Sequence, residues 1–247
     1  MRAGWWCVAA VVAAVGCGRE GRGERASRSV DTPAASAASD APSASAETSG
    51  SRRTITFMGT SLTAGYGLPD PDSAYPALLQ RRIDSLGLSY DVVNAGVSGE
   101  TSAGARRRLP WTMKRPADVF VLETGANDGL RGLSVDSLRS NIQAIIDSVR
   151  RARPAARIVL VGMEAPPNLG ARYARRFRSV YPELARKNHL PLVPFLLEGV
   201  AGVDTLNQGD GIHPNVRGEH IVADNVWRVL GPLLEEWDRE GKARPAA

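Results

Sequence analysis

Ser61 and, far from it in the sequence, Asp210 and His213 have the chemistry of a hydroxyl nucleophile, a residue that orients a base, and the base. Acyl transfer by a hydroxyl needs a base beside it and a group that orients the base. Asp210 lies three residues before His213, so one turn can bring the carboxylate to the imidazole. Structural alternatives stay open, because Ser61 can cap the helix that follows it and Asp-Gly is a common turn pair.

Gly96 and Asn127 are candidate donors for the oxyanion that develops during acyl transfer. A glycine can present a bare backbone N–H, and an asparagine presents a side-chain amide. Gly96 can equally serve backbone geometry alone, and Asn127 begins an Asn-Asp-Gly loop signal. Because all these residues follow expected strands or precede the last expected helix, their joint occurrence favours the functional interpretation.

A parallel sheet would bring these residues together. Apolar, β-rich runs predict strands over 54–58, 90–94, 118–122, 157–161 and 190–195. Helical spacing of apolar residues predicts helices over 75–86, 101–109, 135–151 and 173–184 and after Asn215, with Pro182 marking a kink or a restart. Alternation of strand and helix predicts a three-layer α/β/α sandwich with a five-stranded parallel sheet. The carboxyl ends of parallel strands share one edge, where the candidate residues would meet.

The N-terminal segment, residues 1–17, is typical of a targeting signal. Its apolar run, Trp5 to Val15, is too short to span a bilayer. The end of this segment, 14–17, resembles a bacterial lipoprotein signal, which implies cleavage before Cys17 and lipidation of that cysteine. An ordinary secretory signal cut nearby is the alternative. We therefore expect a lipid-anchored protein on the periplasmic side of the bacterial cell envelope, or a secreted one.

Three further segments complete the expected organisation. Residues 18–51 are rich in Ala, Ser, Gly and Pro, and such a segment cannot bury enough apolar surface to fold, so it predicts a disordered linker. The folded domain is expected over 52–240, followed by a flexible tail over 241–247.

Composition argues against a zinc or thiolate metal site and against nucleic-acid binding in the folded domain. The two cysteines, Cys7 and Cys17, both precede it, and the three histidines lack zinc-site spacing. The net charge is +5, but arginine is spread along the chain instead of forming one stripe. We expect no metal and no nucleic-acid partner.

The domain resembles the SGNH hydrolase family, also called GDSL esterases and lipases, over Thr54 to Trp237. The resemblance is greatest to the branch of thioesterase I, lysophospholipase L1 and arylesterases. It is carried by residues 59–62, 94–99, 125–128, 162–170, 181–185, 191–195 and 210–214. It implies a flavodoxin-like SGNH hydrolase fold and an enzyme that needs no cofactor or metal.

The resemblance also implies roles for the candidate residues. Ser61 would be the nucleophile, His213 the base and Asp210 the residue that orients it. The oxyanion donors would be Gly96, Asn127 and the Ser61 N–H. Thr60 stands where the family motif has aspartate, and it can make a local backbone hydrogen bond without a charge.

The loop 164–170 would line the acyl pocket by the same resemblance, through Pro166, Asn168 and Leu169; a rigid connector is the alternative. The expected activity is hydrolysis of short-chain acyl or aryl esters, thioesters or lysophospholipids through an acyl-enzyme. Two alternatives remain: removal of O-acetyl groups from carbohydrate, and a non-catalytic lipoprotein that uses a hydrolase fold for binding.

Overall fold

A computed structural model describes residues 52–243, with side chains described to residue 240. The predicted signal segment with Cys17, the predicted linker 18–51 and the last four residues lie outside the described residues. All the candidate catalytic residues lie within them.

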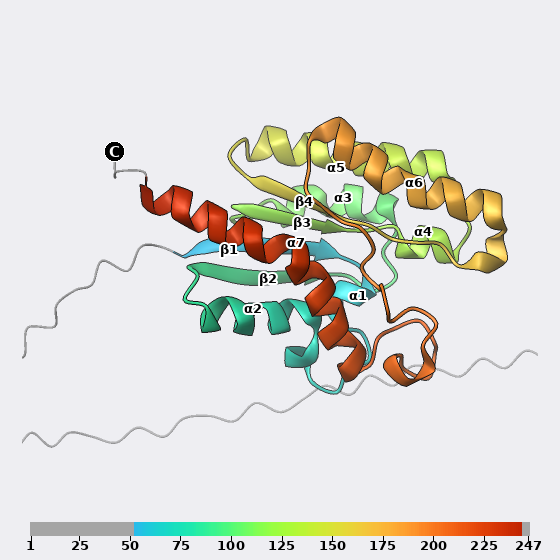
Figure 1. Cartoon of the computed structure of the whole chain (residues 1–247). Coiled ribbons are helices and arrows are strands. Elements are labelled where there is room, and N and C mark those ends of the chain that lie inside the picture. Colours follow the sequence, from blue (N-terminus) through green and yellow to red (C-terminus); the bar gives the residue numbers. More distant parts are fainter. Residues whose placement is uncertain (1–51, 244–247) are drawn as a thin grey trace, which may run out of the picture. The chain divides into compact units, whose positions relative to one another are not determined.

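Five parallel strands form the central sheet in the order β2-β1-β3-β4-β5 (Figure 1). They are β1 (Arg53–Gly59), β2 (Tyr90–Gly96), β3 (Val119–Glu123), β4 (Arg157–Val161) and β5 (Leu192–Val193). All five residues of β3 are buried, as expected for a central strand with helices on both faces. The predicted five-stranded parallel sheet is confirmed.

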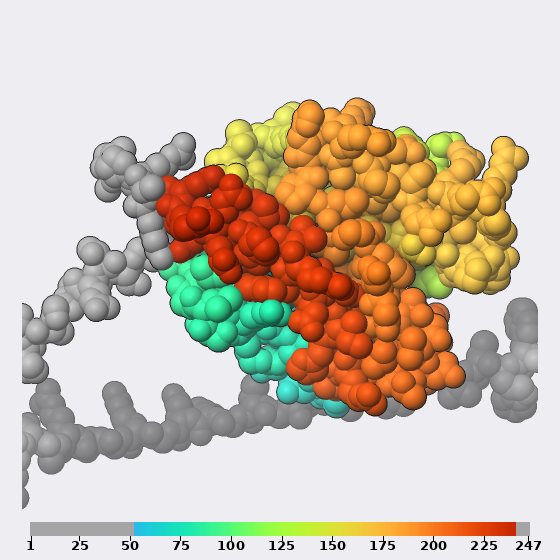
Figure 2. All heavy atoms as spheres, in the orientation of Figure 1, coloured from blue at the N-terminus to red at the C-terminus, as the bar shows by residue number. Residues whose placement is uncertain are grey.

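Helices cover both faces of the sheet (Figure 1). Helices α3 (Ser102–Thr112), α5 (Val135–Ala152) and α6 (Ala171–Asn188) pack side by side on one face, and α2 (Tyr75–Ser85) and α7 (Val216–Ala243) pack together on the other. Figure 2 shows α7, in red, crossing its face between α2 and the orange segment that follows α6. This is the predicted three-layer α/β/α sandwich.

Helix α5 forms for the reasons seen in its sequence. Ser134 caps its first turn by accepting the Ser137 N–H at 3.3 Å. Its apolar stripe is fully buried against the sheet and its neighbours: Leu138, Ile142, Ile145, Ile146 and Val149. Burial of each such side chain contributes roughly 1.5–3 kcal/mol, so packing rather than helix propensity holds this element.

Three elements differ from their predicted limits. Strand β5 pairs with β4 only at Leu192 and Val193, because the prolines at 191 and 194 have no N–H to donate. Helix α6 neither ends nor restarts at Pro182, since its buried side chains continue on both sides of that residue. Helix α7 extends to Ala243, so the first part of the predicted tail is helical.

Short elements stand at the carboxyl edge of the sheet, at the right in Figure 1. Helix α1 (Ser61–Ala64) follows β1 and α4 (Ala126–Leu130) follows β3. Three 3₁₀ turns complete the set: η1 (Pro71–Ser73), η2 (Pro167–Leu169) and η3 (Asp204–Leu206). The loops around α1 and α4 therefore leave the middle of the sheet, where they can present side chains together.

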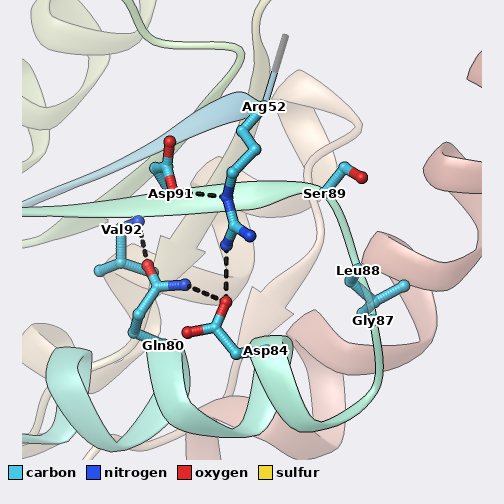
Figure 3. A pocket seen from close by; sticks show the side chains of 8 residues that line it. All are labelled: Arg52, Gln80, Asp84, Gly87, Leu88, Ser89, Asp91 and Val92. Atoms are coloured by element: carbon cyan, nitrogen blue, oxygen red, sulfur yellow. Dashed lines mark hydrogen bonds and ion pairs between the residues drawn. The ribbon is translucent and has the colours of Figure 1, made fainter. Parts of the chain in front are cut away.

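The amino edge of the sheet carries a polar recess (Figure 3). There Arg52 donates to Asp84 at 2.6 Å and pairs with Asp91 at 2.6 Å, and Gln80 also bonds Asp84.

Over the described range 52–243, no helix has the length and apolar character needed to cross a bilayer. The same residues contain no cluster of His, Cys, Asp and Glu able to hold a metal ion.

Candidate active site

Ser61 stands where β1 turns into α1. Thr60 is the N-cap of that helix, and its hydroxyl accepts the Leu62 N–H at 3.4 Å. Because Thr60 does the capping, the Ser61 hydroxyl is left to meet another group. Gly59 is required before the turn, since a Cβ at that position would overlap the Thr63 side chain.

The Ser61 hydroxyl meets the candidate base directly. The distance from Ser61 Oγ to His213 Nε2 is 2.8 Å, and the distance from His213 Nδ1 to Asp210 Oδ2 is 2.6 Å. The other Asp210 oxygen accepts the backbone N–H groups of Ile212 and His213, at 2.9 and 3.0 Å. Asp210 therefore forms the turn that the structural alternative predicted, and the same turn holds the imidazole of His213. The structure brings together all three residues predicted from the sequence.

Asp210 keeps its charge in this arrangement. Burial raises the pKa of Asp210, but the hydrogen bonds from His213 and the Ile212 N–H outweigh that effect and lower the pKa to about 2. An ionised Asp210 favours the imidazole tautomer with its proton on Nδ1, which leaves Nε2 free to accept a proton from Ser61.

Asn127 lies in the first turn of α4, and its Nδ2 donates to the Glu100 carbonyl at 3.0 Å. An amide nitrogen carries two protons, so one remains for a ligand. Buried Asp128 accepts the Ser102 N–H at 2.7 Å and the Ser102 hydroxyl at 2.6 Å, which ties the start of α3 to α4. This link, missed in the sequence, fixes Asn127 against the loop after β2.

The prediction that Gly96 offers a free N–H is wrong. Gly96 ends β2, and its N–H already donates to Asn94 Oδ1 at 3.0 Å. A Cβ at this position would overlap the backbone of Ala64, so the close approach of β2 to α1 explains the glycine. The alternative of a purely structural role therefore holds for Gly96.

Gly99, three residues further on, is the glycine of this loop that lines the cavity beside Ser61. It lines the same cavity as Ser61 and Asn127, and its φ of +76° is a conformation that favours glycine. Within the described part of the chain, its N–H has no hydrogen-bond acceptor. Both glycines stand in the block 94–99, and the sequence does not reveal which N–H is already engaged.

Glu123, at the end of β3, is a second residue that the sequence analysis missed. Its side chain is fully buried and accepts the Thr60 N–H at 2.6 Å, the Thr60 hydroxyl at 2.9 Å and the Thr63 hydroxyl at 3.0 Å. Burial raises the pKa of Glu123, and the hydrogen bonds from Thr60 and Thr63 oppose that rise. Thr60 therefore bonds to more than local backbone. An acid at the end of an otherwise apolar strand was the available signal.

A cavity of about 960 Å³ opens beside Ser61 and His213. Its apolar wall comes from the segments after β4 and β5 and from three other side chains. The residues are Met163, Ala165, Pro166, Pro167, Phe195 and Leu197, together with Tyr66, Leu130 and Ile212. Tyr66 also packs its ring against that of His213, with centroids 4.8 Å apart. The site thus joins a hydroxyl–imidazole pair to a large apolar surface.

Of the three residues predicted to line the acyl pocket, only Pro166 lines the cavity beside Ser61. Asn168 and Leu169 lie in η2 and are not part of the cavity wall. Leu169 points instead toward Gly132, where a Cβ would lie 3.4 Å from it. Pro167 takes the place expected of Asn168, because the η2 turn carries the chain away from the cavity after Pro167.

A serine, a histidine and an aspartate in hydrogen-bonded series, at the carboxyl edge of a parallel α/β sheet, define the class of α/β serine hydrolases. The chain belongs to the GDSL-like Lipase/Acylhydrolase family, whose model matches residues 57–221. This match confirms the expected family, and the parallel sheet with helices on both faces confirms the expected fold.

Three relatives resemble most of the chain. Esterase TesA of Pseudomonas aeruginosa is 42% identical over 184 residues, which cover 74% of this chain and 90% of the relative. Thioesterase 1/protease 1/lysophospholipase L1 of Escherichia coli K12 is 37% identical, covering 73% of this chain and 85% of the relative. An arylesterase of Vibrio mimicus is 33% identical, covering 71% and 87% respectively.

A solved structure gives the same fold. The psychrotrophic esterase EstA from Pseudoalteromonas sp., inhibited by monoethylphosphonate, superposes with a TM-score of 0.69 at 32% identity. The match covers 74% of this chain and 99% of EstA. The likeness therefore extends over the whole of that smaller protein and over the hydrolase domain of this one.

Proposed function

We propose that this protein is a serine esterase that hydrolyses short-chain acyl or aryl esters, thioesters and lysophospholipids through an acyl-enzyme. Ser61 Oγ attacks the carbonyl carbon while His213 Nε2 takes its proton. His213 then gives that proton to the departing alcohol or thiol, which leaves the acyl group on Ser61. Water, activated by the same imidazole, releases the acid and restores the serine.

The observation that carries the proposal is the hydrogen-bonded series Ser61–His213–Asp210, with 2.8 and 2.6 Å between its members. The donors for the oxyanion would be the N–H groups of Ser61 and Gly99 and the remaining Asn127 amide proton. The names of the relatives, which include esterase, thioesterase and arylesterase, support the choice of ester and thioester substrates. The apolar cavity wall would take the acyl or aryl group.

The test uses p-nitrophenyl butyrate with the full-length protein and its Ser61→Ala variant. We expect Ser61→Ala to lower kcat by about 10⁶-fold, as removal of the nucleophile does in another serine hydrolase. A fluorescent alkylphosphonate probe should label the wild-type protein and not Ser61→Ala. Near-native turnover by Ser61→Ala, or equal labelling of both proteins, would exclude Ser61 as the nucleophile.

We further propose that lipid on Cys17 anchors the enzyme in the bacterial envelope. The support is the small-residue run before Cys17, which resembles a lipoprotein signal, together with an apolar segment too short to span a bilayer. Cys17→Ser should appear in the soluble fraction or remain an uncleaved precursor, whereas Cys7→Ser should behave as wild type. Recovery of a processed Cys17→Ser protein in membranes would contradict the anchor.

A further inference from the structure

The sheet order places Ser61 between two different surroundings. The order β2-β1-β3-β4-β5 puts the turn after β1, with Ser61, beside the turn after β3, with Asn127. The apolar cavity wall comes mainly from the segments after β4 and β5, on one side of this pair. The loop 97–101 follows β2, on the other side. An ester bound at Ser61 therefore has most of its apolar neighbours on the side of β4 and β5.

A second recess, of about 500 Å³, lies on the β2 side. It is formed by the loop 97–101 and Gly104 together with Arg107, Arg108 and Arg131, and we call it the arginine recess. Ser98 and Gly99 line both this recess and the apolar cavity, so the two spaces adjoin at Gly99, the proposed oxyanion donor.

The arginine recess holds uncompensated positive charge. Arg108 is paired with Glu100 through two bonds of 2.8 and 2.7 Å. Arg131 donates to the Gly99 carbonyl at 3.1 Å, and neither it nor Arg107 pairs with any carboxylate among residues 52–240. The recess in Figure 3 is different, because Arg52 there lies between Asp84 and Asp91. Of the two recesses, only the arginine recess adjoins Ser61's cavity and has cations to offer an anion.

We propose that the arginine recess binds a phosphate carried by the leaving group of the substrate, while the acyl chain lies against the apolar wall. This rests on the proposed esterase function and deepens it, because it assigns a binding site to the phosphate of those substrates whose alcohol or thiol is phosphorylated. Guanidinium groups bind phosphate oxygens through paired, charge-assisted hydrogen bonds. Arg131 follows α4, the helix of Asn127, so the recess is fixed relative to the candidate oxyanion donor.

Two natural leaving groups have this chemistry. One is the phosphorylated pantetheine of coenzyme A thioesters, and the other is the glycerophosphate of a lysophospholipid. Matched neutral substrates exist for both: the S-acyl-N-acetylcysteamine thioester for the first and the monoacylglycerol for the second. The ratio of kcat/KM for a phosphorylated substrate to that for its neutral partner measures recognition of phosphate separately from the chemical step.

The experiment compares this ratio between the wild-type protein and the Arg107→Gln/Arg131→Gln double variant. We expect the ratio to fall roughly 10-fold for at least one pair, because charge-assisted hydrogen bonds to the phosphate are lost. Arg106→Gln is the matched control, since Arg106 is also exposed on α3 but bonds Asn141 outside the recess. If the ratio falls only for butyryl-coenzyme A, the phosphate bound in the recess is that of a coenzyme A thioester. If it falls only for lysophosphatidic acid, the phosphate is that of a lysophospholipid. Ratios unchanged in both pairs would overturn the proposal.

A binding measurement keeps the inference testable if the enzyme proves inactive. Coenzyme A and neutral pantetheine, and likewise glycerol 3-phosphate and glycerol, are titrated calorimetrically into Ser61→Ala protein. In at least one pair the phosphorylated compound should bind more tightly, and that preference should disappear when Arg107→Gln and Arg131→Gln are added. Failure of the proposed function shows as no hydrolysis of any neutral ester, whereas failure of this inference shows as equal binding within both pairs.

Discussion

Two carboxylates stand close to the nucleophile turn, and their surroundings differ in every respect. Asp210 lies on a loop at the cavity, with its side chain 38% exposed, and its hydrogen bonds lower its pKa to about 2. Glu123 lies at the end of β3 with no exposed surface, and burial raises its pKa. Asp210 bonds the base, His213, whereas Glu123 bonds the turn that carries Ser61.

The difference teaches that one chemical group serves two purposes according to its solvation. Asp210 can stay ionised because water and three hydrogen bonds support its charge, so it can stabilise an imidazolium that forms during the reaction. Glu123 is withdrawn from solvent, and its bonds to Thr60 and Thr63 hold backbone in place. Changes at Asp210 should therefore alter the rate, and changes at Glu123 should alter stability first.

Among the variants that test this comparison, the largest effect is expected for Asp210→Asn. Loss of the carboxylate should lower kcat by about 10⁴-fold, because the amide favours the wrong imidazole tautomer. The thermal midpoint should change little, since the side chain is part of an exposed loop. The measurements are kcat on p-nitrophenyl butyrate and the thermal midpoint. A variant within 10-fold of the wild-type rate would mean that Asp210 only shapes its turn.

Asn127→Ala tests a donor that contacts neither carboxylate. We expect kcat to fall by about 10²–10³-fold with little change in KM, because an oxyanion donor acts chiefly on the transition state. Full kinetic curves for the variant and for Asn168→Ala, a control in η2 outside the cavity wall, would check this. If KM rises while kcat is unchanged, Asn127 binds the substrate and does not stabilise the oxyanion.

Glu123→Ala should show the opposite pattern to Asp210→Asn. It leaves the Thr60 N–H and two threonine hydroxyls without their buried acceptor, which should lower the free energy of unfolding by roughly 3 kcal/mol. Glu123→Gln, which keeps one acceptor oxygen, should lose less. Urea denaturation of the two variants gives the comparison. Equal stability of wild type and Glu123→Ala would show that the buried bonds are not needed.

Thr60→Asp, which restores the family motif, would place a second carboxylate where the Thr60 hydroxyl now lies 2.9 Å from Glu123. Two adjacent carboxylates cannot both ionise easily, so the folded variant should retain a proton that the unfolded chain releases. Its stability should therefore fall as pH rises above about 5, while Thr60→Ser should follow the wild type. Thermal midpoints between pH 5 and 8 test this, and parallel curves for all three proteins would contradict it.

Glu219 extends the comparison to a buried acid with a single donor. Burial raises the pKa of Glu219 from 4.5 to about 8, and the Tyr75 N–H, at 2.8 Å, only partly opposes that rise. The folded state binds this proton more tightly than the unfolded state does. The contribution of Glu219 to the free energy of unfolding should therefore decrease as pH rises from about 5 to 8. Glu219→Gln should flatten that slope. Equal slopes for variant and wild type would indicate an ionised Glu219 at neutral pH.

Much of the fold could be predicted because its signals are local. The apolar runs of β3 and β4 and the stripe and cap of α5 each specify an element without reference to the rest of the chain. Elements whose ends depend on contacts with other parts of the chain were predicted less well. Strand β5 pairs with β4 at only two residues, between the prolines at 191 and 194. Helix α6 continues through Pro182 because its packing on both sides of that residue outweighs one lost hydrogen bond.

The sequence by itself determined the family and the identity of Ser61, Asp210 and His213, because residue type and order along a parallel sheet suffice to specify them. Only the tertiary structure decided which glycine N–H is free. The Gly96 N–H donates to Asn94 and Gly96 packs against α1, whereas Gly99 lines the cavity. Likewise, the contact of Glu123 with Thr60 joins residues 63 apart in the chain. Such hydrogen bonds depend on where two strands end in space, which no local pattern records.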